Sequence, residues 1–326
     1  MLKKKKILII GGAGYVGSRL SSYLALLNYD VTVLDLFIYG EQVFSTKEIK
    51  KIKGDIRDKK IINQSLQNQD IVIHLACISN DPSFDLDPNI GKSINFSSFL
   101  PILDECRINN IEKFIYASSS SVYGIKNEKN VHEDIELDPL TDYSRFKAEC
   151  ERALLSHDSD FCKVIVRPAT VCGYSKRQRL DLVVNILTNF GFHKNEILVM
   201  GGKQLRPNLH INDMIDVYKL LIEADNNKIN KQIYNAGYEN LSVTSIANLV
   251  KDIIGNSVSI KYEKTDDNRS YHISSEKIQD ELNFTHKYKI ADAIEDLVKA
   301  FSKNEFNDPL NNEIYYNVRK MKNYQF

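Results

Sequence analysis

The sequence has little that would suit a membrane or a nucleic acid as partner. Its 43 Lys and Arg residues balance its 43 Asp and Glu residues, so it lacks the basic surplus that such anionic partners attract. No apolar run approaches the roughly 18 residues that a membrane-spanning helix needs. The apolar run after the N-terminal lysines covers only residues 7–10, which is too short for a signal peptide. We therefore expect a cytoplasmic protein that binds neither a membrane nor a nucleic acid.

Cysteine is scarce as well. The five cysteines are odd in number and show neither a C-x-x-C pair nor a spacing with histidine that suits metal ligation. We expect reduced, mostly buried thiols and no structural metal.

Short β-branched runs alternate with helical patterns in the first half of the chain. Near-continuous apolar runs such as 71–75 predict strands that are buried on both faces, which is typical of a parallel sheet. Repeated strand–helix–strand units of this kind predict a doubly wound α/β (Rossmann) fold. The expected strands are 7–10, 31–36, 49–55, 71–75, 114–118 and 164–167.

The pattern changes after residue 172, so we expect a Rossmann domain at 1–172 and a smaller α/β part at 173–326. The sheet is expected to be rejoined within about 207–240, where the run 233–236 suits a strand. The chain has 7 prolines and no Pro/Gly/Ser-rich linker, which indicates that the second part is docked on the first. The helices expected there are 182–190, 213–224, 243–254, 275–282 and 290–301.

Glycines cluster between the first expected strand and the helix after it. Gly11, Gly14 and Gly17 fit the pattern G-x-x-G-x-x-G. Glycines there let the backbone turn sharply and approach a pyrophosphate, while the helix N-terminus supplies N–H donors. Asp35 ends the second strand about 20 residues on, where a carboxylate accepts the adenosine ribose hydroxyls. The combination predicts a dinucleotide site, and the alternative is a turn used only for packing.

Acidic residues after the second and third strands bear on the cofactor. The Asp35 carboxylate would repel a 2′-phosphate, and residues 36–38 offer no arginine to hold one, which favours NAD over NADP. Asp55 and Ile56 close the third strand where the adenine edge would lie, although Asp55 could instead be a turn residue.

Tyr143 and Lys147 are spaced i, i+4 at the start of an expected helix, which puts them on one face. A phenol with a pKa near 10 is a poor base at neutral pH, and a nearby ammonium favours the phenolate. The pair follows a buried strand that opens into serines 118–121, at the edge where α/β sheets bind ligands. One serine hydroxyl could bond the reacting oxygen, although a serine run is also common in plain loops.

Six motifs together resemble one family. GGAGYVGS, GDIRD, HLA, YASSSSVYG, YSRFK and RPATVCG occur in the order found in the extended short-chain dehydrogenase/reductases, and the chain looks like the NAD-dependent epimerase/dehydratase branch that acts on nucleotide sugars. The resemblance implies Ser119 as the catalytic hydroxyl, Tyr143 as acid/base and Lys147 as its tuner. The cofactor contacts are then Gly11, Gly14, Tyr15, Val16, Gly17, Asp35, Asp55, Ile56, Leu75, Ala76, Tyr143, Lys147, Pro168 and Thr170.

Two departures from the family pattern bear on the reaction. Members that dehydrate at C5–C6 carry an acidic pair after the catalytic hydroxyl, where this chain has Ser120 and Ser121. A 4,6-dehydration is therefore not expected. Many members also read Arg-x-Phe-Asn where this chain has Arg-Pro-Ala-Thr at 167–170, which puts the usual Asn contact to substrate in doubt.

Arginines in the second part are candidates for the substrate. Arg206 and Arg269 stand where the family places arginines for the diphosphate, and a guanidinium suits phosphate oxygens. The charged segment 176–181 could close over the nucleotide, with Arg179 as its contact, or be a solvated loop. Ser119 and Ser120 complete the expected substrate contacts.

We therefore predict an NAD-dependent nucleotide-sugar epimerase that works through a transient 4-keto intermediate, with Tyr143 as acid/base. The same residues would serve a C4-dehydrogenase or a 4-keto reductase, and a non-catalytic NAD(H)-binding sensor is a remote alternative. The resemblance also implies a homodimer. The nucleotide and the sugar stay open.

Overall fold

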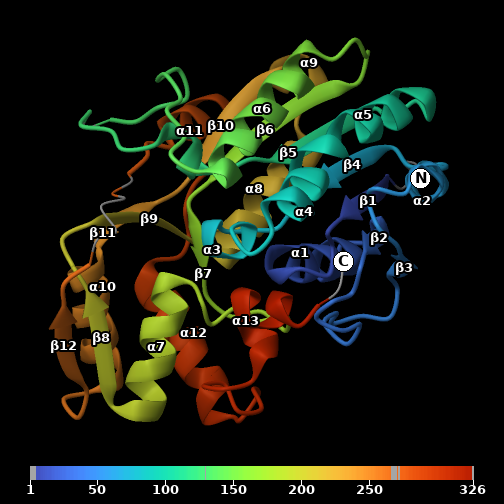
Figure 1. Cartoon of the computed structure of the whole chain (residues 1–326). Coiled ribbons are helices and arrows are strands. Elements are labelled where there is room, and N and C mark those ends of the chain that lie inside the picture. The colour runs from blue at the N-terminus through green and yellow to red at the C-terminus, as the bar shows by residue number, and fades with distance from the viewer. Residues whose placement is uncertain (1–4, 129, 266–269, 271, 325–326) are drawn as a thin grey trace.

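The computed structural model describes residues 5–128, 130–265, 270 and 272–324. Its centre is a parallel seven-stranded sheet in the order β10-β6-β5-β4-β1-β2-β3, with helices on both faces (Figure 1). The predicted doubly wound α/β fold is confirmed. The strands are β1 (Lys6–Ile10), β2 (Asp30–Asp35), β3 (Lys50–Lys53), β4 (Ile71–His74), β5 (Lys113–Ala117), β6 (Cys162–Pro168) and β10 (Gln232–Ala236).

Strand β1 shows why the sheet needs two helical layers. Ile7 and Ile9 belong to the core on one face, Leu8 and Ile10 belong to the core on the other, and all four are fully buried. Successive side chains of a strand point to opposite faces, so an unbroken apolar run needs cover on both sides. One layer is α1 (Tyr15–Leu26), α8 (Ile211–Glu223) and α11 (Glu276–Leu282), and the other is α2 (Lys59–Leu66), α5 (Phe99–Ile108) and α6 (Asp142–Ser156).

Short elements complete the sheet-bearing part. They are α3 (Asp81–Phe84), α4 (Pro88–Lys92), a π-helical turn (Ser93–Ser97), a 3-10 turn (Ser120–Tyr123) and α9 (Asn226–Ile229).

The second part has a core of its own. Strands β8 (Glu196–Met200) and β12 (Ser259–Glu263) pair in parallel. Helices α7 (Val183–Lys194), α10 (Val243–Ile254) and α12 (Ile290–Ser302) pack around them. This is the smaller α/β part that the sequence predicts.

A three-stranded sheet lies between the two parts. It contains β7 (Thr170–Cys172), β9 (Leu205–His210) and β11 (Glu239–Ser242). Val171 packs into the core of the large sheet and the next residue, Cys172, into the core of the second part. The region 207–240 returns to the large sheet through β10, whereas β9 and β11 do not join it. Pro207 and the polar side chains of β9 hide that strand from pattern analysis.

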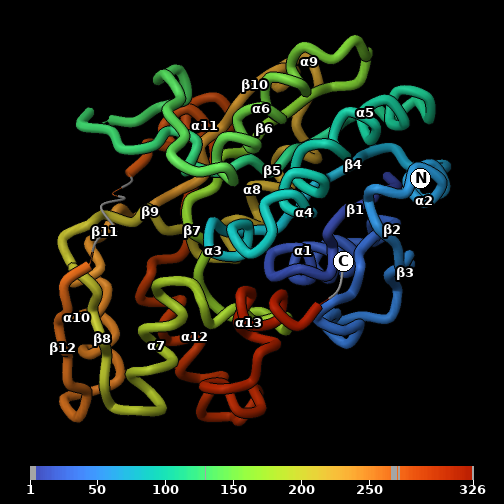
Figure 2. The backbone as a smooth tube through the Cα atoms, in the orientation of Figure 1, coloured from blue at the N-terminus to red at the C-terminus, as the bar shows by residue number. Residues whose placement is uncertain are grey.

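The last helix, α13 (Asn317–Lys322), turns back onto the sheet-bearing part after a 3-10 turn (Glu313–Tyr315). Met321 packs into the core that contains Ile10 and Leu34. The C-terminal end of the chain therefore lies near the first strands, at the edge of the sheet (Figure 2).

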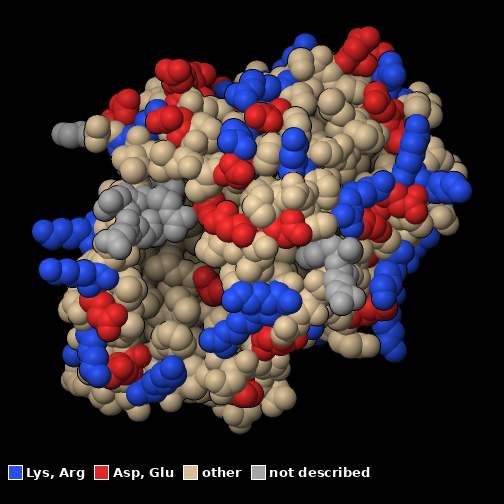
Figure 3. All heavy atoms as spheres, in the orientation of Figure 1, with Lys and Arg blue, Asp and Glu red and all other residues tan. Residues whose placement is uncertain are grey.

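Within the described residues, no helix combines the length and the apolarity that crossing a membrane requires. Positive and negative side chains occur side by side over the face drawn in Figure 3.

Candidate active site

A continuous cleft of about 560 Å³ runs along the carboxyl ends of the sheet strands and reaches the second part. This edge is where open α/β sheets bind ligands. Arg269 lies outside the described residues. The other predicted site residues all line the cleft: Gly11, Gly14, Tyr15, Val16, Gly17, Asp35, Asp55, Ile56, Leu75, Ala76, Ser119, Ser120, Tyr143, Lys147, Pro168, Thr170, Arg179 and Arg206.

The glycine turn leaves no room for side chains. Gly11 has a φ of +84°, and a Cβ there would lie 2.5 Å from the backbone nitrogen of Ala76. A Cβ on Gly17 would lie 2.3 Å from the carbonyl oxygen of Gly11, so helix α1 packs directly on the turn. Gly14 caps α1 without any side-chain hydrogen bond, so no side chain covers the first N–H groups of that helix. Such a bare helix N-terminus suits a phosphate.

Asp35 lies beside this turn at the end of β2. Its carboxylate accepts hydrogen bonds from the backbone nitrogens of Ala13, at 2.9 Å, and Phe37, at 2.8 Å. Burial raises the pKa of Asp35 above its usual value, although these backbone donors lower it. The carboxylate therefore joins the glycine turn to the loop after β2 and faces the same cleft.

Asp55 lies at a turn and also lines the cleft, so its contact with the adenine edge stays a prediction. It lines the cleft, and its carboxylate also accepts from the backbone and guanidinium of Arg57, with an ion-pair distance of 2.6 Å. Burial acts to raise the pKa of Asp55, but the bonds from Arg57 outweigh it and the pKa is lowered. Ile56, next to it, supplies an apolar wall.

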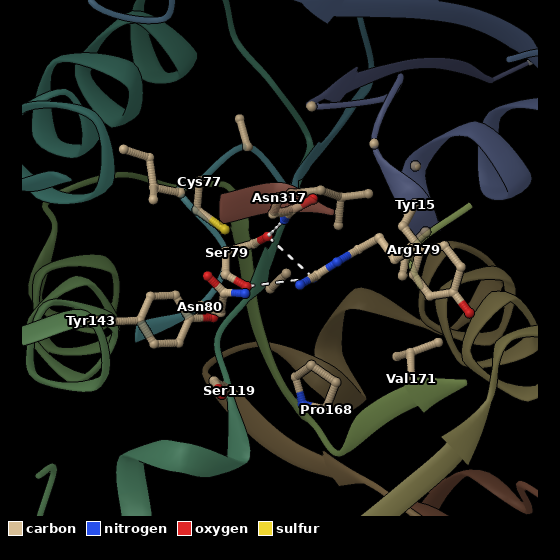
Figure 4. A pocket seen from close by; sticks show the side chains of 18 of the residues that line it. Tyr15, Cys77, Ser79, Asn80, Ser119, Tyr143, Pro168, Val171, Arg179 and Asn317 are labelled. Carbon is tan, nitrogen blue, oxygen red and sulfur yellow. Dashed lines mark hydrogen bonds between the residues drawn. The ribbon is translucent and has the colours of Figure 1, made fainter. Parts of the chain in front are cut away.

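Tyr143 and Ser119 lie near each other at the other end of the cleft (Figure 4), and Lys147 lines the cleft with them. Thr141 caps α6 and donates to the Asp81 carboxylate at 2.6 Å, which fixes the start of the helix and places Tyr143 in its first turn. One turn on, the Lys147 Nζ donates to the Ala117 carbonyl oxygen at 2.6 Å and lies 5.9 Å from the centre of the Tyr143 ring.

Burial and nearby charged and polar groups set the pKa of the Tyr143 phenol. Burial raises the pKa of Tyr143 well above its usual range, and Asp81 adds to the rise, whereas the Ser119 hydroxyl and Arg179 lower it. A phenolate at this position therefore depends on positive charge nearby. Lys147 and Arg179 both line this end of the cleft.

A buried ion pair lies beneath this end. The guanidinium of Arg167 in β6 binds both carboxylate oxygens of Glu151 in α6, at 3.0 and 2.7 Å, and also donates to the Tyr123 hydroxyl at 2.8 Å. Ser118, next to Ser119, donates to the same carboxylate. The pair ties the helix of Tyr143 to the strand end of Ser119, and pattern analysis did not find it.

In the segment 176–181, Lys176 is exposed and Asp181 is partly buried, but residues 177–180 are buried, with Arg177 4% and Arg179 8% exposed, so the interpretation of the segment as a solvated loop is wrong. Arg179 donates to Asp181 at 2.9 and 3.2 Å and to the Ser79 hydroxyl at 3.3 Å. Arg206 of β9 lines the cleft from the second part.

Comparisons with known proteins agree with this geometry. The sequence model of the NAD dependent epimerase/dehydratase family matches residues 7–237. The chain belongs to this family. It is therefore an enzyme whose cofactor is NAD, as the sequence predicts.

Three relatives illustrate the likeness. A protein of Sinorhizobium fredii, the uncharacterized y4nG, is 34% identical over 202 residues, covering 61% of this chain and 48% of that protein, so the match spans about half of that relative. The UDP-glucose 4-epimerase of Lactobacillus helveticus is 26% identical over 271 residues, covering 76% of this chain and 82% of that enzyme. The structure of UDP-glucuronic acid 4-epimerase from Bacillus cereus, in complex with UDP-glucuronic acid and NAD, has a TM-score of 0.81 at 26% identity, covering 91% of this chain and 99% of that one.

The cleft of this family member fits NAD. The bare turn at Gly11 and Gly14 suits the pyrophosphate, Asp35 suits the adenosine ribose, and Tyr143 with Lys147 would adjoin the nicotinamide. Among the other residues that line the cleft and that the sequence did not single out are Tyr39, Arg177, Asn317 and Met321. Of these four residues, only Arg177 belongs to a feature that the sequence analysis named, the charged segment 176–181.

Proposed function

We propose that the protein is an NAD-dependent nucleotide-sugar epimerase that works through a transient 4-keto sugar, with Tyr143 as acid/base. The observation that carries this proposal is that Ser119, Tyr143 and Lys147 come together at one end of a cleft whose other end suits the rest of the dinucleotide. Arg206 lines the cleft from the second part, and its guanidinium would bind the diphosphate of the sugar nucleotide.

The residues of the chain account for the proton transfers. NAD bound in the cleft would supply the acceptor and the donor of the hydride. The Tyr143 phenolate takes the proton of the sugar's C4 hydroxyl as the C4 hydride leaves, and returns it when hydride comes back to the other face. The Ser119 hydroxyl forms a hydrogen bond with the reacting oxygen and keeps it in position for the proton transfer. Lys147 and Arg179 supply the positive charge that the phenolate needs in this buried place.

Ser120 and Ser121 support an epimerase over a dehydratase. They stand after the catalytic hydroxyl, where the family's dehydratases carry acidic residues, and Ser121 instead bonds the Ser119 hydroxyl at 2.8 Å. A neutral hydroxyl is a poor acid for expelling water. The keto sugar is therefore expected to be reduced again, not dehydrated.

Product analysis tests the proposal. The enzyme is incubated with NAD and with UDP-, GDP-, CDP- and dTDP-sugars while NADH absorbance and sugar NMR are followed. An epimerised sugar without accumulated NADH is the expected result, whereas accumulating NADH and a released 4-keto sugar would indicate a C4-dehydrogenase. Tyr143→Phe should abolish turnover, and undiminished turnover in that variant would refute the assignment of Tyr143.

A further inference from the structure

The guanidinium of Arg177 is buried in the cleft without an acidic partner. Its Nη2 donates to the Asn317 side-chain oxygen at 2.6 Å and its Nη1 to the Gln178 carbonyl oxygen at 3.1 Å. Its Cζ lies 3.5 Å from the centre of the Tyr39 ring. Among the described residues, its Nε has no hydrogen-bond partner. The groups in direct contact with this cation are neutral, and the carboxylates of Asp35 and Asp181 interact with its charge without forming an ion pair with it in the described structure.

The two other buried arginines near the cleft differ in this respect. Arg167 is paired with Glu151 at 2.7 Å and Arg179 with Asp181 at 2.9 Å. Burial lowers the pKa of Arg177 to about 10, so the group is still charged at neutral pH. Because a buried charge is costly unless it is paired, a site built around this cation is expected to receive an anion.

The position of Arg177 indicates which anion. Its segment is fixed to the start of α1, since the Tyr15 hydroxyl donates to the Gly173 carbonyl oxygen at 2.6 Å and the Ser175 hydroxyl to the Tyr15 carbonyl oxygen at 3.0 Å. The charge of Arg177 also lowers the pKa of Asp35. Arg177 therefore lines the same cleft as the helix N-terminus that suits phosphate and the carboxylate that suits the ribose, and it interacts with that carboxylate. A dinucleotide that spans these two groups would bring its pyrophosphate toward Arg177.

We propose that Arg177 binds the pyrophosphate of NAD(H) and that Asn317 of α13 is a positioning residue that orients it. Asn317 is 3% exposed and joins four segments of the chain. Its side-chain oxygen accepts from Arg177 and from the Tyr39 hydroxyl, at 3.1 Å. Its amide nitrogen donates to Ser79 at 3.0 Å (Figure 4), and its backbone nitrogen donates to Asp181 at 2.9 Å.

The C-terminal helix thereby becomes part of the cofactor site. Met321, one turn further on, lines the same cleft. An epimerase must keep its reduced cofactor until the hydride returns, and a second contact from the C-terminal half would slow its escape. This inference rests on the cofactor site alone, and it stands whichever reaction the enzyme performs.

Binding measurements on the cofactor-free enzyme test Arg177. NADH fluorescence titration of Arg177→Gln should show a dissociation constant raised by about ten- to a hundredfold, as for the loss of a charge-assisted bond. Arg177→Lys should recover part of the loss, because the charge is kept. The matched control is Arg319→Gln, an exposed arginine on the same helix as Asn317, which should bind NADH as the parent enzyme does.

Competing ligands identify the contact. ADP should lose affinity in Arg177→Gln, while adenosine, which lacks phosphate, should not. If adenosine loses as much as ADP, the role of Arg177 is structural and the proposal fails. If NADPH loses far more than NADH, the contact is to a 2′-phosphate and the proposal is equally overturned.

Asn317→Asp tests the positioning role. Aspartate keeps the shape and the acceptor for Arg177 but adds the negative charge that the guanidinium lacks. We expect NADH affinity to fall by about as much as in Arg177→Gln, without a lower melting temperature of the free enzyme. Full NADH affinity in Asn317→Asp would refute the inference.

Discussion

The two ends of the cleft are built differently. At the end that we propose to be catalytic, Tyr143 and Lys147 lie one turn apart on α6, and a buried ion pair ties that helix to β6, which pairs with the strand that precedes Ser119. At the part of the cleft that we propose for the pyrophosphate, Tyr39, Arg177 and Asn317 come from loops and a terminal helix that are far apart in sequence. One end is held by regular secondary structure, the other by side-chain contacts across segments. Substitutions at the end held by secondary structure should lower the free energy of unfolding, and substitutions at the end held by side-chain contacts should lower the affinity for the cofactor.

Breaking the ion pair tests the first half of this comparison and should have the largest effect. Arg167→Met leaves Glu151 buried without its partner, which costs about 3–5 kcal/mol of unfolding free energy. Urea unfolding measures this loss of unfolding free energy. The control is Arg145→Met, which breaks the exposed pair with Asp142 and should cost less than about 1 kcal/mol. Replacing both partners, as in Arg167→Met with Glu151→Leu, should recover much of the loss. A loss below 1 kcal/mol in Arg167→Met would show that the pair does not hold this end together.

The same comparison explains what the sequence could predict. Tyr143 with Lys147 and the glycines with Asp35 were predictable, because helix geometry and the strand–turn–helix unit fix their relative positions locally. The cofactor class follows from that unit as well.

Arg177 and Asn317 were not predictable as a pair. No local rule relates a residue before α7 to one in the last helix, and their meeting follows only from the way α13 packs back on the sheet. The ion pair of Arg167 with Glu151 was missed for the same reason, because a strand and a helix supply one partner each and neither residue type marks a buried position.

Gly17→Ala tests the turn that both ends of the dinucleotide depend on. The new Cβ would lie 2.3 Å from the Gly11 carbonyl oxygen, so α1 must move away from the turn and carry its N–H groups with it. NADH affinity should fall about a hundredfold, equivalent to about 2.7 kcal/mol, in the titration used for Arg177. Gly255→Ala is the control: its Cβ would enter open space at the end of α10, but its φ of +126° disfavours a side chain, so this variant should lose some folding stability and keep the NADH affinity of the parent enzyme. If Gly17→Ala binds NADH normally, the phosphate site is not at this turn.

The smallest expected effect is a loss of unfolding free energy at acidic pH that arises from His74, near the proposed catalytic end. His74, at the end of β4, is 3% exposed, stacks on Phe99 and has an unpartnered Nδ1 within the described structure. Burial, helped by the charge of Lys147, lowers the pKa of His74 to about 3. Above pH 6.5 the ring is neutral in the folded and the unfolded chain, so its protonation does not reduce the free energy of unfolding. As the pH falls from 6.5 toward 3, only the unfolded chain takes up the proton, and the free energy of unfolding decreases.

His74→Leu removes this titration. Between pH 7 and pH 5 the parent enzyme should lose about 2 kcal/mol more unfolding free energy than the variant, as follows from 1.36 kcal/mol per pH unit below 6.5. Urea unfolding of both proteins at the two pH values measures the difference, and the carboxylates common to both cancel in it. Arg177→Gln should keep the parent's pH dependence, since it alters the other end of the cleft. Equal losses in the parent and His74→Leu would mean that His74 takes up its proton in the fold as readily as in the unfolded chain, and the assignment of a lowered pKa to His74 would be wrong.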